Sequence, residues 1–190
     1  MSILPRVCQR HQRSQSQAFT LSELMVTVAV IGIVGSLVFA SSQVFLRRDQ
    51  ANAAAAELVG WLEGISGRSG AFGPCTVQFT TANGLAPGAT FASLQGSDAR
   101  CTSEANLALP STDGNRTYNV AVTYTPAGTT SMAFTPRGGV VANGVEAIVK
   151  ISVNNQLPLR CVRVSFGTLS TGINNATGDV TQACSVWERT

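Results

Sequence analysis

The stretch FTLSELMVTVAVIGIVGSLVFA, residues 19–40, decides the fold of this chain. It is a long, mainly apolar run in which Glu23 is the only charged residue. At ~1.5 Å per residue, a helix over this stretch would be ~33 Å long, which is enough to cross the hydrocarbon core of a membrane. A carboxylate inside such a segment is costly and usually has a partner. We therefore expect one membrane-spanning helix in which Glu23 has a specific role.

The helix is expected to continue beyond the apolar stretch. No proline occurs between Pro5 and Pro74. A helix from about Phe19 to about Ile65 would be ~70 Å long, which is more than a globular domain of this size can bury. Glycines at positions 64, 67, 70 and 73 predict that it ends near Ile65. Apolar residues with helical spacing follow Gln50 and form the expected core face: Ala51, Ala54, Ala55, Leu58, Leu62 and Ile65.

The net charge of the chain lies entirely in its first 18 residues. The sequence has 13 Lys and Arg against 10 Asp and Glu, and residues 1–18 contain Arg6, Arg10, Arg13 and no acid. Residues 19–190 are therefore net neutral, so the overall charge of +3 indicates targeting and is no evidence for an anionic ligand. The positive charges on either side of the apolar stretch favour a cytoplasmic N-terminus by a small margin.

Three interpretations of this N-terminal region compete. It could be a cleavable secretory signal that ends at Val38-Phe39-Ala40, although Glu23 and the long basic region argue against this. A plain single-pass anchor leaves Glu23 unexplained. The third interpretation rests on a resemblance: the stretch AFTLSELM, residues 18–25, resembles the processing site of type IV pilins and type II secretion pseudopilins.

The resemblance assigns roles to three residues. It implies that a prepilin peptidase cuts between Ala18 and Phe19 and methylates the new amine of Phe19. Glu23 becomes the fifth residue of the mature chain and neutralises the N-terminal ammonium of a neighbouring subunit, which is favourable because two buried unlike charges then lie together. The family has Gly where this chain has Ala18, so processing is expected to be slower. The apolar stretch also lacks the late proline of many major pilins, which favours a minor subunit.

Residues 67–190 have the composition of a β-rich domain. Turn signals such as Asn83-Gly84, Pro87-Gly88 and Gly178-Asp179 separate short β-branched runs. We expect an α+β, type IV pilin-like fold, in which a long N-terminal helix packs on a small antiparallel sheet. Its expected parts are a leader (1–18), a transmembrane and assembly helix (19–66) and a periplasmic domain (67–190). The expected strands are Thr76–Thr80, Asn119–Thr125, Ser131–Thr135, Ala147–Val153, Arg160–Phe166 and Thr181–Val186.

A second resemblance involves the soluble region. The pattern F-x-P-x-G at Phe134–Gly138, followed by two further strands, resembles the soluble domain of the GspH/FimT family of minor pilins. The segment Phe72–Asn115 shows no such resemblance.

Four cysteines remain once Cys8 is assigned to the leader: Cys75, Cys101, Cys161 and Cys184. Four cysteines allow three pairings, and we favour Cys75–Cys101 and Cys161–Cys184 because each closes a short segment. Such bonds suit an oxidising periplasm or cell surface, and free buried thiols are the alternative. A zinc site is not expected, because no C-x-x-C spacing occurs and no histidine follows His11.

The sequence predicts a structural protein. Because the only histidine, His11, lies in the leader, no His-dependent triad is expected, and we predict no catalytic residue, cofactor or metal. We expect a minor pilin or pseudopilin of a type IV pilus or a type II secretion system, single-pass in the bacterial inner membrane. Its expected partners are other pilins, the prepilin peptidase and the membrane. The alternative is a DNA receptor, although Arg160 and Arg163 should point to opposite faces of a strand and no Gly-Arg-x-Arg element follows them.

Overall fold

The computed structural model describes residues 20–95, 100–101, 104–111, 116–135, 145–165 and 168–189, without the side chains of residues 40 and 41. The chain divides into two compact units, Met1–Ser41 and Ser42–Thr190. In the first unit the described residues form the beginning of helix α1. The second unit contains the rest of α1 and all the described strands.

Helix α1 runs from Leu21 to Phe72, so the predicted long N-terminal helix is present. Its end near Ile65 was predicted wrongly. An added Cβ at Gly64 or Gly67 would meet no atom within 4 Å, so these glycines only weaken the helix by about 1 kcal/mol each. Packing extends the helix past them, because the Ser69 hydroxyl is buried and donates to the carbonyl oxygen of Thr135 at 2.8 Å. The helix ends at Gly73, whose φ of 106° is the left-handed conformation typical of a C-terminal cap.

The strands of the second unit form two antiparallel sheets, where one small sheet was predicted. The α+β class is therefore confirmed, with a larger β part than expected. The four-stranded sheet has the order β4-β3-β1-β6, with β1 Cys75–Phe79, β3 Thr90–Gln95, β4 Asn106–Ala108 and β6 Met132–Phe134. The six-stranded sheet has the order β10-β9-β8-β7-β5-β2, with β2 Ala82–Leu85, β5 Tyr118–Thr125, β7 Glu146–Val153, β8 Gln156–Ser165, β9 Thr168–Asn174 and β10 Val186–Arg189.

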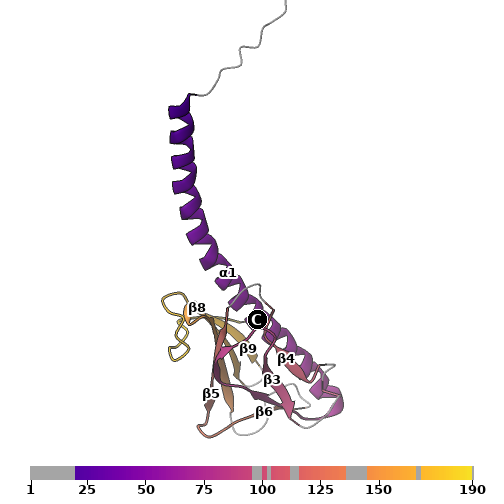
Figure 1. The fold of residues 1–190 in the computed structure, drawn as a ribbon. Helices are drawn as coiled ribbons and strands as arrows, with labels where there is room; N and C mark the ends of the chain where they lie inside the picture. The colour runs from indigo at the N-terminus through magenta and orange to yellow at the C-terminus, as the bar shows by residue number, and fades with distance from the viewer. Residues whose placement is uncertain are drawn as a thin grey trace, which may run out of the picture. The chain divides into compact units, whose positions relative to one another are not determined.

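The last part of α1 completes the core of the second unit, as the helical spacing predicted. Figure 1 shows this part of the helix running beside the strands. Leu58, Leu62 and Ile65 are fully buried and belong to the same cluster as Val77 of β1 and Val149 of β7. The helix therefore packs against side chains from both sheets, and this burial is what stabilises it beyond its intrinsic propensity.

Two local predictions on the β part were wrong. The expected strand Thr181–Val186 is mostly loop, and only its last residue belongs to β10. The Asp179 carboxylate accepts a hydrogen bond from the backbone N–H of Thr181 at 2.9 Å, which holds a turn in place of a strand. Asn83-Gly84 is not a free turn but lies in β2, where Gly84 has a φ of 72° at a register shift. The remaining expected strands, near β1, β5, β6, β7 and β8, are confirmed.

Candidate functional site

The start of α1 is organised by Thr20 and Glu23. The backbone N–H and the hydroxyl of Thr20 each donate to Oε2 of Glu23 at 2.9 Å. In return, the backbone N–H of Glu23 donates to the Thr20 hydroxyl oxygen at 3.3 Å. This reciprocal pattern is a capping box, which satisfies N–H groups that the first turn of a helix leaves without partners. The T-x-x-E spacing was the sequence signal for it, and our sequence analysis had missed Thr20.

The segment after Glu23 carries no charge until Arg47. Two of its hydroxyl groups are satisfied within the helix: Thr27 donates to the carbonyl oxygen of Leu24 at 2.9 Å, and Ser36 donates to that of Ile33 at 2.7 Å. Every described side chain between residues 20 and 39 is exposed, and the segment is long and apolar enough to cross a membrane. An exposed apolar surface of this extent requires lipid or apolar protein partners.

Of the three residues predicted to act in processing and assembly, the structure gives the geometry of one. Glu23 lies in the first turn of α1, whereas Ala18 and Phe19 lie outside the described residues. The roles of all three therefore stay predictions.

Residues 13–39 match the family model described as the prokaryotic N-terminal methylation motif. The matched range includes the predicted cleavage position and Glu23. The match supports a type IV pilin-like protein. No curated protein and no solved structure matches the chain. The pilin-like classification rests on this motif and on a fold in which a long apolar helix precedes antiparallel sheets, and the motif points to a structural protein. Both features are consistent with membrane anchoring and incorporation into a pilus.

Two disulfide bonds lie in the second unit. They are Cys75–Cys101, 26 residues apart, and Cys161–Cys184, 23 residues apart. These are the pairings that the short loops favoured. The first joins β1 to the segment before β4 inside the main core, and the second joins β8 to the loop before β10 in a small separate cluster. Each bond therefore ties a loop to a central part of a sheet.

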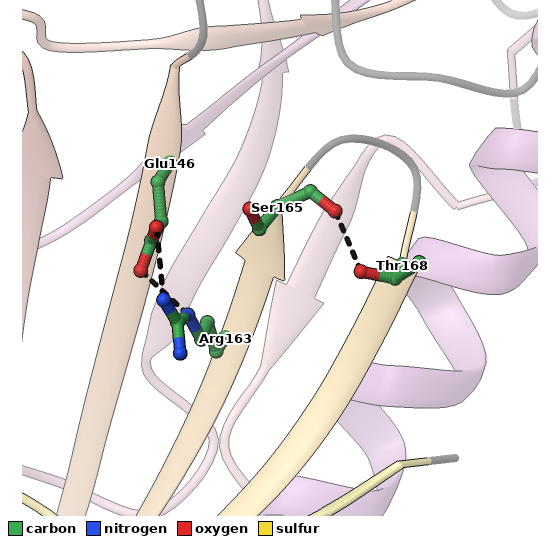
Figure 2. Close-up of polar contacts among 4 residues, drawn as sticks. All are labelled: Glu146, Arg163, Ser165 and Thr168. Atoms are coloured by element: carbon green, nitrogen blue, oxygen red, sulfur yellow. Dashed lines mark hydrogen bonds and ion pairs between the residues drawn. The ribbon is translucent and has the colours of Figure 1, made fainter.

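Arg160 and Arg163 lie on opposite sides of β8, as their odd spacing predicted. The Arg163 guanidinium forms an ion pair with Glu146 of β7, with 2.6 Å between Nε and Oε1, and Figure 2 shows the two side chains pointing toward each other. The same guanidinium lies 5.7 Å from the ring centroid of Trp187. Arg160 instead lines a cavity with Asn52 and Ala55 of α1. Because Glu146 neutralises Arg163, the two arginines do not form a joint basic surface.

Proposed function

We propose that this protein is a minor pilin or pseudopilin, a structural subunit of a type IV pilus or of a type II secretion pseudopilus. The observation that carries the proposal is the methylation motif over residues 13–39, with Glu23 as the only charged residue between residues 14 and 46. Within this class, the GspH/FimT family is the best candidate. Its support is the order of β6, which ends at Phe134, followed by the antiparallel strands β7 and β8. Such a subunit acts in fibre initiation or at the fibre tip.

Maturation begins when prepilin peptidase removes residues 1–18 and methylates the amine of Phe19. The chain is then anchored in the inner membrane by the segment after Glu23, with the β-rich domain in the periplasm. Neighbouring pilin helices cover the apolar surface of this segment during assembly.

Glu23 pairs with the N-terminal ammonium of a neighbouring subunit in the assembled fibre. Both hydrogen bonds donated by Thr20 go to Oε2, and Oε1 accepts none from the described part of the chain. An incoming ammonium can therefore bind Oε1 while the capping box stays intact. Each charge pays a smaller net desolvation free energy in the pair than it would alone, because the attraction between the two charges compensates part of that cost.

Intact-mass analysis tests the maturation step. The full chain is produced in a host that has prepilin peptidase and in one that lacks it. We expect a chain that begins at methylated Phe19 in the first host only, and a larger processed fraction when Ala18→Gly restores the family's residue. A chain that begins at Ser41 would identify an ordinary signal peptide and refute the proposal.

Substitutions at Glu23 test the assembly step. Glu23→Ala removes both the charge and the cap, whereas Glu23→Gln keeps a side chain that can complete the capping box but has no charge. We expect both variants to insert into the membrane and to lose co-purification with partner pilins by tenfold or more, while the matched control Ser22→Ala retains it. If Glu23→Gln retained its partners, the residue would act through the cap, and the charge-pairing proposal would be wrong.

A further inference from the structure

A cavity of about 170 Å³ lies within the second unit, where α1 meets β8 and β9. Its lining includes Asn52 of α1, Arg160 of β8 and Thr171 of β9. Oδ1 of Asn52 and Nε of Arg160 are both buried, and neither has a hydrogen-bond partner in the described part of the chain. Buried polar groups without partners are uncommon in folded proteins and require an explanation. One acceptor and one cationic donor that line the same cavity indicate a ligand that offers the opposite groups.

Arg48 adds a second positive charge at this place. It precedes Asn52 by four residues, so the two side chains lie on the same face of α1. Burial lowers the pKa of Arg160, and repulsion by Arg48 lowers it further, while Glu188 acts in the opposite direction. The guanidinium groups nevertheless stay charged at neutral pH. In the described part of the chain, neither arginine forms an ion pair. Two neighbouring cations, offset by Glu188 but by no ion pair among the described residues, attract an anionic ligand.

The surroundings are basic as well. Arg47 donates from Nε to the carbonyl oxygen of Gln43 at 3.0 Å, and Arg116 donates to Oε1 of the same glutamine at 2.8 Å. Asp49 is the only acidic residue of α1 between residues 42 and 56. This part of the second unit therefore carries a local excess of positive charge, although the chain after residue 18 is neutral overall.

The position along the chain identifies the kind of anion. Residues 24–46 carry no charge and would form a helix ~35 Å long, so Arg47 and Arg48 follow directly where a membrane-spanning segment ends. Exposed apolar side chains accompany the arginines: Val44 is 41% and Leu157 47% exposed, and both line a second cavity together with Arg47. Apolar side chains next to arginines are typical of the boundary between lipid headgroups and acyl chains.

We propose that Arg48 and Arg160 bind the headgroup of an anionic phospholipid in the leaflet where the apolar segment ends. The guanidinium groups bind the phosphodiester through charge-assisted hydrogen bonds. Oδ1 of Asn52 accepts a hydrogen bond from a headgroup hydroxyl, such as those of phosphatidylglycerol. The lipid compensates the two neighbouring positive charges and fixes the second unit at the membrane surface. The inference requires membrane anchoring but does not depend on assembly into a fibre.

Native mass spectrometry of the full chain tests the proposal. The protein is released from detergent micelles that contain equal amounts of phosphatidylglycerol and phosphatidylcholine. We expect at least fivefold preferential retention of phosphatidylglycerol, and a decrease of about fivefold for each of Arg48→Gln and Arg160→Gln, the effect expected of one basic residue near a membrane surface. Arg160→Lys should retain part of the preference. Arg68→Gln, at an exposed arginine of the same helix, is the matched control, and thermal unfolding verifies that each variant is folded.

Four results would overturn the proposal. Equal retention of the two lipids, or equal behaviour of Arg160→Gln and Arg68→Gln, would show that the cavity does not select a lipid. Displacement of phosphatidylglycerol by inorganic phosphate at equimolar concentration would identify a site for free anions. Loss of a co-purified pilin from Arg160→Gln, without any change in lipid retention, would assign the cavity to an acidic side chain of another subunit. The lipid-retention measurement itself uses the protein without its partners, and only the co-purification needs them, so failure of the lipid measurement would leave the proposed role of Glu23 intact.

Discussion

Removal of the Cys161–Cys184 disulfide by the double substitution C161A/C184A should lower the stability of the second unit. The two cysteines are 23 residues apart, and the loop-entropy relation gives a loss of about 3.5 kcal/mol at 25 °C for a loop of this length. The second unit comprises Ser42–Thr190, for which average values predict an unfolding entropy of about 0.3 kcal/mol per kelvin. The expected decrease in Tm is therefore about 10 °C.

The two tryptophans make this decrease measurable in the full chain in detergent. Trp61 is 9% exposed and donates from Nε1 to the carbonyl oxygen of Glu104 at 3.0 Å, near the other disulfide. Trp187 follows Cys184 by three residues and lies beside Arg163. Thermal unfolding is recorded by fluorescence in Trp61→Phe and Trp187→Phe backgrounds. Coincident transitions from both probes would show that the unit unfolds cooperatively.

The other disulfide provides the matched comparison. Its cysteines are 26 residues apart, so the same relation predicts nearly the same loss for C75A/C101A. Cys75 and Cys101 also belong to the main core, and the lost packing should make this variant the less stable of the two. Non-reducing mass analysis first verifies that the Cys161–Cys184 bond is present in the parent protein. A decrease in Tm of less than about 3 °C for C161A/C184A, which corresponds to roughly 1 kcal/mol, would then refute the loop-closure argument.

Two further predictions use the same unfolding assay. Gly64→Ala should stabilise the protein by about 0.5–1 kcal/mol, because the added methyl group meets no atom within 4 Å, whereas Gly172→Ala should destabilise it, because its Cβ would lie 2.8 Å from the Trp187 ring. Equal effects of the two substitutions would contradict this reasoning. Hydrogen bonds from Thr181 lower the pKa of Asp179, so its contribution is present above the ordinary Asp pKa of about 3.9 and is lost as the pH falls through the lowered value. Asp179→Ala should therefore lower the Tm at pH 7, and this decrease should become smaller as the pH falls through the lowered pKa. A decrease independent of pH would show that the carboxylate charge is irrelevant.

The features that were predicted correctly depend on residues that lie close together in the sequence. The uncharged run after Glu23 and the apolar spacing from Ala51 to Ile65 define the two parts of α1 without any tertiary information. In β5 the alternation of Val120, Val122 and Tyr124 with the smaller or more polar residues Asn119, Ala121 and Thr123 was sufficient to place the strand. Among the three possible cysteine pairings, the observed one was favoured because each bond closes a short segment.

The features that were missed depend on tertiary context. In β3 two consecutive residues, Phe91 and Ala92, are fully buried at a shift in register, so the strand does not alternate. In β9 a glycine stands where the Trp187 ring covers the backbone, and β9 contains mostly small polar residues without a strong strand preference. The approach of Arg160 to Arg48 follows from the pairing of β8 with its neighbours and from the packing of α1, and neither can be inferred from local sequence.

The charges at the two ends of the uncharged segment need different partners. The phosphate groups of a membrane surface can neutralise Arg48 but not the carboxylate of Glu23. In the proposed assembly the cation for Glu23 comes from protein, and between residues 19 and 46 the only basic group that the processed chain would offer is its N-terminal amine. In a single chain Oε2 of the carboxylate already receives two hydrogen bonds from Thr20, which leaves Oε1 for the ammonium that the proposed assembly supplies. Glu23 thus favours contact between subunits, whereas Arg48 and Arg160 favour contact with lipid, and the same helix can satisfy both requirements at once.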